Sequence, residues 1–354
     1  MQLKKIQEYD LRSKRILLRV DFNVSVENGK IKEKFKIESC KETLDYLIGM
    51  NCKIAMLSWL GRPGGKKDPK FSLEQISDDV EKLLGYEIKF VSECEGEKVK
   101  NIVNNLGNKE VALLENVRFY SGEGDVESGT EYNQSFAQKI AANFDVFVND
   151  AISVSHRNQA SVVGVAKFIP SYAGFKLQKE VEEFEKIRNN SQHPAVAIIG
   201  GAKIETKLPV IKFFEQIYDY VLVGGKIANE AADRKIDFGR KVILPEDYSG
   251  ERLDIGPKTI EKFSEVIKNA KTIVWNGPLG KFEDKEYAKG TQAVFEAIIS
   301  SGAYTVVGGG ETLEILEKNS AMNKVNFVST GGGAMLEYIG GGQMPGIEVL
   351  KLKI

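Results

Sequence analysis

The stretch from Gly174 to Asn190, GFKLQKEVEEFEKIRNN, lies near the middle of the chain and separates two halves of different character. Its apolar side chains recur every three or four residues, which is the spacing of one face of an α-helix. Charged residues fill most of the other positions, and Pro170 and Pro194 lie outside the two ends. We therefore predict one amphipathic helix over 174–190 that buries the stripe Leu177, Val181, Phe184 and Ile187.

The length of the chain favours two domains on either side of this helix. At 354 residues it exceeds the size at which single hydrophobic cores usually stop growing. We place one domain at 1–170, the helix at 174–190 and a second domain at 191–342, with a short apolar tail at 343–354. The alternative is a single large domain that carries the helix on its surface.

The composition excludes several functional classes. A formal net charge of −1 provides no global field that would attract nucleic acid or an anionic membrane. No apolar run approaches the roughly 20 residues of a membrane helix, and the polar N-terminus lacks the apolar stretch of a signal peptide. Three cysteines without CxxC spacing and only two histidines argue against a disulfide framework and a histidine-rich metal site. We expect a cytoplasmic monomer with no nucleic-acid or membrane partner.

In the first half, short apolar runs alternate with helical patterns, which is the rhythm of a parallel α/β sheet. The runs are continuous, as in strands that are buried on both faces. We predict strands at 15–20, 53–58, 87–91, 111–114 and 145–148, and helices at 39–49 and 73–84. The glycine-containing acidic segment 120–132 is predicted to be a solvated loop.

The second half repeats this rhythm, but its strands run into glycine. The predicted strands are 195–199, 220–223, 272–275, 304–307 and 326–329. Because the carboxyl ends of parallel strands lie along one edge of a sheet, these glycine turns would meet there. Glycine lets an anion approach the backbone N–H groups at the start of a helix. A nucleotide or polyphosphate site is therefore favoured over a set of mere tight turns. The expected fold class is α/β, with two doubly wound parallel-sheet domains joined by an interdomain helix.

Two lysines support an anion site in the second half. Lys203 and Lys207 follow Gly200 and Gly201 at a spacing that would put both on one face of the helix they begin. Lysine near a helix N-terminus opposes the helix dipole, so neutralisation of phosphate explains the placement better than stability does.

The predicted strand ends of the first half carry a different set of polar residues. Asp21 and Asn23 follow the first strand, and Arg62, Arg118 and Arg157 lie on three later turns. Guanidinium groups that converge on one sheet edge suit bidentate recognition of carboxylate or phosphate, so a small polyanion is the expected ligand.

No serine–histidine–acid arrangement is evident, and paired carboxylates are not favoured over scattered surface acids. An ionised nucleophile needs no general base, because catalysis then depends on positioning and charge stabilisation. One anion site in each half therefore fits transfer of a phosphoryl group between two anionic partners.

At this point a family resemblance becomes clear. The chain resembles phosphoglycerate kinase through motifs that run in order along its length: RVDFNV (19–24), SWLGRP (58–63), LLENVRFY (113–120), FVNDA (147–151), SHR (155–157), IIGGAK (198–203), LDIGPKTI (253–260), IVWNGPLGKFE (273–283), VVGGGET (306–312) and STGGGA (329–334). The resemblance implies two α/β domains, a tail that returns to the N-terminal domain, and reversible phosphoryl transfer between 1,3-bisphosphoglycerate and ADP. The products would be 3-phosphoglycerate and ATP, with Mg²⁺ as the metal.

The resemblance also implies roles for individual residues. The phosphoglycerate would be held by Asp21, Asn23, Lys36, Trp59, Arg62, Arg118 and Arg157. The transferring group would be stabilised by Lys203, Lys36, Gly331, Gly332 and Gly333. The nucleotide would lie against Gly201, Ala202, Lys203, Lys207, Gly224, Gly225, Asn276, Pro278, Glu283, Gly308, Gly309, Gly310, Glu311 and Thr312. Glu311 would contact the metal.

Several positions depart from the family pattern. Lys36 replaces an arginine, Trp59 a histidine before LGRP, Gln159 the second histidine of HRxH, and Glu311 an aspartate. Lys226 and Asn229 replace a small and an aromatic residue, and only 27 residues separate Gly225 from Leu253. The missing part helps to build the adenosine pocket in the family.

We expect an active phosphoglycerate kinase in a shortened form, with hinge bending near 170–174 and 189–194. Two alternatives remain open at this point. One is a related protein that has lost turnover and serves as a binding or interaction module. The other is a kinase for a related carboxylic acid, because Trp59 and Gln159 change the acid pocket.

Overall fold

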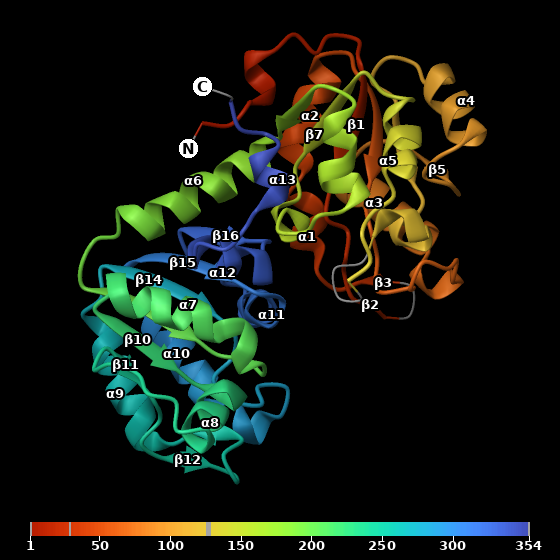
Figure 1. Cartoon of the computed structure of the whole chain (residues 1–354). Coiled ribbons are helices and arrows are strands. Elements are labelled where there is room, and N and C mark those ends of the chain that lie inside the picture. Colours follow the sequence, from red (N-terminus) through yellow and green to blue (C-terminus); the bar gives the residue numbers. More distant parts are fainter. Residues whose placement is uncertain (1, 28–29, 125–128, 353–354) are drawn as a thin grey trace. The chain divides into compact units, whose positions relative to one another are not determined.

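The computed structural model describes residues 2–27, 30–124 and 129–352. The chain forms two compact units, Met1–Val181 with Gln343–Ile354 and Glu182–Gly342. The division falls within helix α6 (Phe175–Asn189), which therefore contributes to both units (Figure 1).

The first unit is built on a six-stranded sheet in the order β5-β6-β4-β1-β7-β8. Every neighbouring pair in it is parallel. The strands are β1 (Arg15–Arg19), β4 (Lys53–Leu57), β5 (Ile88–Val91), β6 (Val111–Leu114), β7 (Val146–Asn149) and β8 (Ser171–Ala173). The chain adds strands on one side of β1 and then crosses to β7 on the other side, so the sheet is doubly wound with its switch point between β1 and β7.

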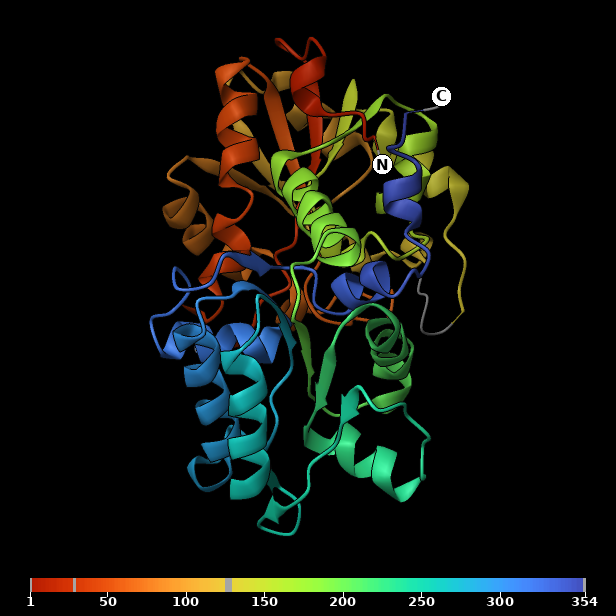
Figure 2. The ribbon, with the colours of Figure 1, turned by 90° about the vertical axis from the view of Figure 1, so that its left-hand side faces the viewer.

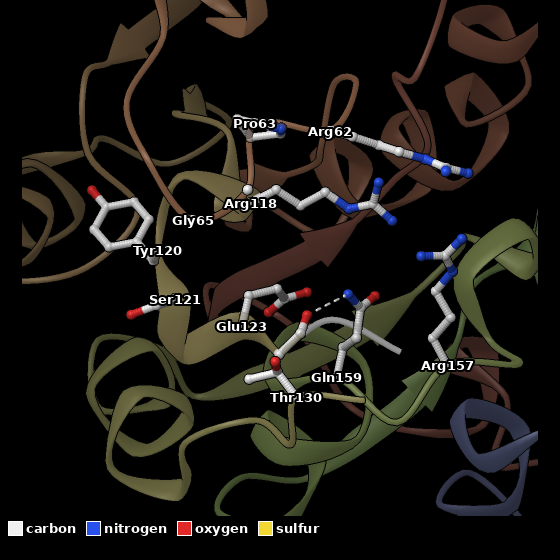
Figure 3. Close-up of a pocket in the computed structure, with 12 residues that line it drawn as sticks. Arg62, Pro63, Gly65, Arg118, Tyr120, Ser121, Glu123, Thr130, Arg157 and Gln159 are labelled. Carbon is white, nitrogen blue, oxygen red and sulfur yellow. Dashed lines mark hydrogen bonds between the residues drawn. The ribbon is translucent and has the colours of Figure 1, made fainter. Parts of the chain in front are cut away.

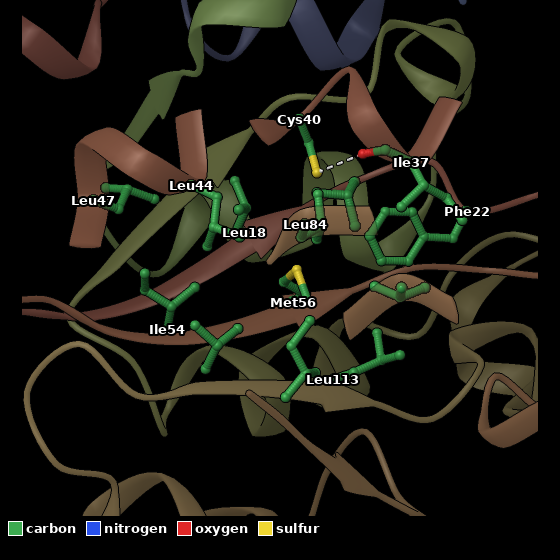
Figure 4. Packing of buried hydrophobic residues seen from close by; sticks show 14 of the residues in the cluster. Leu18, Phe22, Ile37, Cys40, Leu44, Leu47, Ile54, Met56, Leu84 and Leu113 are labelled. Atoms are coloured by element: carbon green, nitrogen blue, oxygen red, sulfur yellow. Dashed lines mark hydrogen bonds between the residues drawn. The ribbon is translucent and has the colours of Figure 1, made fainter. Parts of the chain in front are cut away.

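Helices cover both faces of this sheet because alternate side chains of each strand point to opposite faces. Ile16 and Leu18 pack on the face covered by α1 (Lys34–Glu38), α2 (Lys41–Gly49) and α3 (Glu74–Leu84) (Figure 4). Leu17 packs on the opposite face with α4 (Glu97–Asn105) and α5 (Gln134–Ala141). Both faces of the strands are therefore core.

Smaller elements complete the first unit. β2 (Val26–Glu27) and β3 (Lys30–Ile31) form a short antiparallel pair. The tail carries α13 (Pro345–Glu348), and its Gly346 amide donates to the Ser155 carbonyl (2.8 Å). The Lys4 amide donates to the Leu350 carbonyl (2.8 Å), so the two ends of the chain lie beside one another.

The second unit contains another six-stranded parallel sheet, in the order β11-β10-β9-β14-β15-β16. Its strands are β9 (Ala195–Ile199), β10 (Tyr220–Val223), β11 (Val242–Ile243), β14 (Thr272–Asn276), β15 (Tyr304–Gly308) and β16 (Phe327–Ser329). The switch point lies between β9 and β14, and all five strands that run into glycine belong to this sheet.

Figure 2 shows helices on both faces of this second sheet. α7 (Ile204–Ile217) and α8 (Gly225–Asp233) lie on one side, and α9 (Pro257–Lys268) and α10 (Lys289–Ser300) lie on the other. α11 (Gly310–Lys318) and α12 (Gly333–Ile339) follow β15 and β16, and β12 (Tyr248–Ser249) pairs with β13 (Asp254–Ile255). The expected fold class is thus confirmed, with a doubly wound parallel sheet in each unit.

The predicted stripe of α6 is buried, since Leu177, Phe184 and Ile187 are 0% exposed and Val181 is 3% exposed. In the first unit the Leu177 amide donates to Asp150 Oδ1 (3.2 Å). In the second unit the last two turns of α6 are tied by the hydroxyls of two tyrosines, because Tyr304 donates to Glu183 and Tyr338 to Glu185.

The predicted strands and helices are all present, with shifts of one or two residues at their ends. Strands β8 and β11 were not predicted. Both are edge strands of two or three residues, too short to give a periodic pattern. The prediction that 120–132 is a solvated loop is wrong for Glu123, which is 1% exposed; residues 125–128 of that segment lie outside the described residues.

Within the described ranges, no helix combines the length and the apolar character that crossing a membrane requires.

Asp150 should make the stability of the first unit depend on pH. Burial raises the pKa of Asp150 to about 7, although Thr43 and the Leu177 amide oppose the shift. The unfolded carboxyl ionises near pH 3.9, so between roughly pH 4 and 7 the folded chain holds a proton that the unfolded chain has lost. Stability is therefore greatest below this window and falls as the pH rises through it.

We predict that Asp150→Asn removes this dependence. Between pH 5 and pH 8 the wild-type chain should lose up to about 3 kcal/mol more free energy of unfolding than the variant, as measured by urea unfolding. Asp78→Asn, at an exposed position of α3, is the control and should leave the wild-type pH dependence intact. An Asp150→Asn variant with the wild-type pH dependence would contradict the prediction.

Candidate functional site

Arg118 enters the site from the turn that follows β6. The single-turn 3₁₀ helix η3 (Val117–Phe119) begins after Asn116, whose side chain accepts a hydrogen bond from the Arg118 amide (3.0 Å). The Asn116 amide group also donates to the Leu60 carbonyl (2.7 Å), which ties the turn after β6 to the turn after β4. Arg118 donates from Nη1 to the Gly61 carbonyl (3.0 Å). The guanidinium is therefore positioned by two strand ends at once.

A cavity of about 360 Å³ opens at this edge of the first sheet. The guanidinium groups of Arg62, Arg118 and Arg157 come from three separate turns and lie on the same side of it (Figure 3). Glycine turns, hydroxyls, one carboxylate and one amide complete the lining, which comprises Arg62, Pro63, Gly64, Gly65, Arg118, Tyr120, Ser121, Glu123, Gly124, Thr130, Arg157 and Gln159. The structure thus brings together the three arginines that the sequence suggested.

The electrostatics of this cavity favour an anion. Burial, Arg157 and Arg19 lower the pKa of Arg118 to about 9. Among the residues that the structure describes, Arg118 Nη2 is buried without a hydrogen-bond partner. Burial, Arg157 and Arg118 lower the pKa of His156 to about 4, so this imidazole is neutral at physiological pH. A bound carboxylate or phosphate would relieve the repulsion between the arginines.

Asp21 and Asn23 lie in the turn after β1 and Lys36 lies in α1, and none of the three lines the cavity. Asn23 Oδ1 accepts from the Gly61 amide (2.9 Å), and Asp21 Oδ1 accepts from the Asn23 amide (3.1 Å). Lys36 Nζ donates to the Asn23 carbonyl (2.9 Å) and forms an ion pair with Glu33 (3.2 Å). Lys36 is thus held by protein groups next to the turn that follows β1.

The two residues that depart from the family pattern here are both buried. Trp59 is 8% exposed, and the guanidinium carbon of Arg118 lies 3.6 Å from the centroid of its ring. Gln159 is 2% exposed and donates from Nε2 to the Gly124 carbonyl (3.0 Å). Trp59 therefore contacts Arg118 but does not line the cavity, whereas Gln159 is part of the cavity wall.

Sequence reasoning missed a buried arginine and glutamate that are linked through the hydroxyl of Ser161, with the glutamate in the cavity wall. Arg19 is 0% exposed at the end of β1, and its Nε donates to Ser161 Oγ (3.1 Å). Glu123 accepts from the same hydroxyl (2.6 Å) and from the Ser161 amide (2.9 Å). Burial raises the pKa of Glu123, and Arg19 opposes that shift. The arginine inside the otherwise apolar run RILLRV was the one signal available, because a charge there needs a buried partner.

At the carboxyl edge of the second sheet, the glycine turns interlock at the switch point between β9 and β14. The Gly200 amide donates to the Asn276 carbonyl (2.8 Å), and the Gly201 amide donates to the Pro278 carbonyl (3.0 Å). A Cβ on Gly200 would lie 2.0 Å from the Pro278 oxygen, and Gly277 has a φ of +91°. Only glycine fits at these two positions, so the turns approach each other as closely as backbones can.

The two predicted lysines differ in their surroundings. Helix α7 begins at Ile204, so the exposed Lys203 is its N-cap residue with extended backbone and not part of a helical face as expected. Lys207 lies on the first turn and donates to Asn276 Oδ1. Burial lowers the pKa of Lys207 to about 8, and Glu311 opposes that shift. Lys207 is therefore a desolvated cation beside the glycine turns, whereas Lys203 is free to reach outward.

Asn276 and Thr312 link three of the turns. The Gly277 amide donates to Thr312 Oγ1 (2.8 Å), which joins the turn after β14 to α11. Asn276 is 2% exposed, and its Nδ2 has no hydrogen-bond partner among the residues described. A Cβ on Gly309 would lie 3.1 Å from that Nδ2 atom. This amide donor therefore faces the glycine turn, where a phosphate oxygen could accept from it.

The remaining predicted nucleotide residues occupy the same edge. Helix α8 begins at Gly225, directly after Gly224. The short helix α12 begins at Gly333, after Gly331 and Gly332. Ala202 and Glu283 are exposed beside these turns, and Gly308 and Gly310 flank Gly309.

Glu311 is the carboxylate that suits Mg²⁺ at this edge. Desolvation and the neighbouring Glu283 raise the pKa of Glu311, whereas Lys207 lowers it. A divalent cation would relieve the repulsion between these two carboxylates. Mg²⁺ is commonly coordinated by one or two carboxylates together with substrate phosphates. No cluster of three or more histidine, cysteine or acidic residues suited to a metal occurs in the described part of the chain. The residues present therefore fit a metal that arrives with a nucleotide.

Comparison with known proteins decides the family. The sequence model described as phosphoglycerate kinase matches residues 6–248 and 230–342. The chain belongs to the phosphoglycerate kinase family. A phosphoglycerate kinase of Borrelia hermsii is 36% identical over 397 aligned positions that cover 99% of this chain and 100% of the relative. One from Pelotomaculum thermopropionicum is also 36% identical, with 99% of each chain covered.

Solved structures of the family agree with this assignment. Phosphoglycerate kinase from Pyrococcus horikoshii OT3 superposes with a TM-score of 0.86 at 28% identity, and the enzyme from Coxiella burnetii with 0.80 at 31%. Each match covers 98% of both chains. The two matched segments of the family model overlap at 230–248, within the short stretch between Gly225 and Leu253.

Glu123 should stabilise the fold by compensating Arg19. We predict that Glu123→Gln lowers the free energy of unfolding by about 3 kcal/mol, because it removes the larger of the two acidic influences on the buried Arg19 guanidinium and leaves Asp21 alone to oppose its burial. Urea unfolding at pH 7 measures the change. Glu131→Gln, at an exposed position of the same segment, serves as the control and should have little effect. Equal stability of the two variants would show that Arg19 does not depend on Glu123.

Proposed function

We propose that the chain is a phosphoglycerate kinase, a phosphotransferase with a carboxyl group as acceptor. It would transfer a phosphoryl group reversibly between 1,3-bisphosphoglycerate and ADP, giving 3-phosphoglycerate and ATP. The observation that carries the proposal is the convergence of Arg62, Arg118 and Arg157 on one cavity, in a chain that matches the family from end to end. The full-length match favours turnover over a binding module that has lost it.

In the proposed reaction no general base is needed. In the direction of ATP use, a carboxylate oxygen of 3-phosphoglycerate forms a bond to the γ-phosphorus while the bond from that phosphorus to the β-γ bridging oxygen breaks. The nucleophile is already ionised, so the protein contributes positioning and charge stabilisation. This agrees with the neutral state of His156, whose pKa is about 4.

We assign the acid to the arginine-lined cavity of the first unit. Arg118 offers an open guanidinium edge, because its Nη2 is buried and unpartnered within the described part of the chain. Arg62 and Arg157 would complete a fork suited to carboxylate and phosphate, with Asp21 and Asn23 at the adjoining turn.

We assign the nucleotide to the glycine turns of the second unit. Lys207 and the Nδ2 atom of Asn276 would contact its phosphates, with Lys203 following the transferred group and Gly331 to Gly333 lining the approach. Glu311 would hold Mg²⁺, which when bound neutralises phosphate charge. Transfer requires the two ligands to meet, and we propose that the chain bends near 170–174 and 189–194, at the ends of α6.

The direct test is to incubate the purified chain with MgATP and 3-phosphoglycerate and to measure ADP formation. We expect turnover that depends on both substrates. Lys203→Met should lower kcat roughly 100-fold or more, as does loss of a group that stabilises transition-state charge. Lys212→Met, at an exposed position of the same helix, should leave kcat unchanged. Absence of turnover by a folded wild-type chain at high concentration would refute the proposed function.

Lys36 provides a second test. Arginine would supply a planar fork where lysine is a point donor, so Lys36→Arg should raise kcat by roughly 3- to 10-fold if position 36 faces the transferring group. Lys34→Arg, an exposed position of α1, is the matched control and should not alter the rate. An unchanged kcat in Lys36→Arg would show that the side chain serves only its ion pair with Glu33.

A further inference from the structure

Trp59 lies between the hydrophobic core of the first unit and the acid site. It lies two residues after the end of β4, and its side chain belongs to the apolar cluster that includes Leu57, Val117 and Val154. On its other side the guanidinium carbon of Arg118 lies 3.6 Å from the ring centroid, and that of Arg157 lies 5.9 Å from it. The indole thus separates two cations of the site from the core.

Arg118 needs such support because the groups around it repel it. Burial lowers the pKa of Arg118 most, Arg157, Arg19 and Arg62 lower it further, and Glu123 is the one acid among the main influences that opposes them. Within the described residues Arg118 forms no ion pair, and its guanidinium donates one hydrogen bond, to the Gly61 carbonyl. A buried guanidinium in this position requires an attractive partner that does not occupy the edge meant for the substrate.

The face of an aromatic ring meets that requirement. Its quadrupole attracts a guanidinium stacked on it, more strongly when the pair is desolvated, and the planes of the two groups fit together. A carboxylate in the same place would compete with the substrate for the same N–H groups. Stacking instead leaves the edge of Arg118 available, and its Nη2 is indeed unpartnered within the described ranges.

We infer that Trp59 is a positioning residue that fixes Arg118 for the acid substrate by stacking beneath it, and does not hold the substrate itself. The inference rests on the proposed function for the identity of the ligand, 3-phosphoglycerate. According to this inference, Trp59 contributes to binding through the face of its ring and not through its indole N–H. Replacements that keep or remove the ring therefore give opposite results.

The test measures binding of 3-phosphoglycerate directly by calorimetry on the full chain, without relying on turnover. Trp59→Phe keeps a ring face and removes the N–H, so its Kd should stay within roughly 3-fold of the wild-type value. Trp59→Leu removes the ring, so its Kd should rise roughly 10-fold or more, while the Kd of MgADP remains that of the wild type. Phe144→Leu, in the same apolar cluster but with no cation on its ring among the described residues, controls for lost packing and should leave the acid Kd unchanged.

A spectroscopic measurement adds a second readout. The chain has two tryptophans, Trp59 and Trp275, so 3-phosphoglycerate should change the emission of the wild-type chain but not that of Trp59→Phe. Equal affinities in Trp59→Phe and Trp59→Leu, whether both normal or both weakened, would overturn the inference. A wild-type chain that binds the acid without turnover would refute the proposed function alone, and one that does not bind it would refute both.

Discussion

Each candidate site contains a cationic side chain that the fold buries without pairing it with a carboxylate in the described part of the chain. Burial lowers the pKa of Arg118 to about 9 and that of Lys207 to about 8, and neither side chain forms an ion pair among the described residues. Glu123 and Glu311 oppose the shifts but do not cancel them. Groups fixed in this way cost stability in the free protein and interact more strongly with a polyanion than they would in water.

The two units achieve this arrangement in different ways. In the first unit an aromatic ring and a backbone carbonyl support Arg118, and Ser161 links the buried Arg19 to Glu123 in the cavity wall. In the second unit close contacts between glycine turns exclude side chains from the edge, and Asn276 Nδ2 is buried there without a partner among the described residues. In the proposed assignment, the small acid is thus recognised by guanidinium groups and the nucleotide by the glycine turns.

The sequence predicted the fold well because the strands are continuous apolar runs whose ends carry distinct residues. The stripe of α6 and the five strands that run into glycine follow from periodicity and turn chemistry alone. Glu123 could not be predicted, because a glutamate among glycines resembles a solvated loop until Arg19 and Ser161 are found beside it. The N-cap position of Lys203 and the stacking of Trp59 depend on where turns cross in space, which spacing along the chain does not encode.

The central claim is that each unit holds one ligand independently. Calorimetric titration of 3-phosphoglycerate and of MgADP into the wild-type chain, Arg118→Met and Lys207→Met tests it most directly. The account predicts that Arg118→Met raises the Kd of 3-phosphoglycerate at least roughly 10-fold and leaves the Kd of MgADP unchanged. Lys207→Met should raise the Kd of MgADP and leave that of 3-phosphoglycerate unchanged. A variant that weakens binding of both ligands equally, or of neither, would contradict the assignment of the two sites.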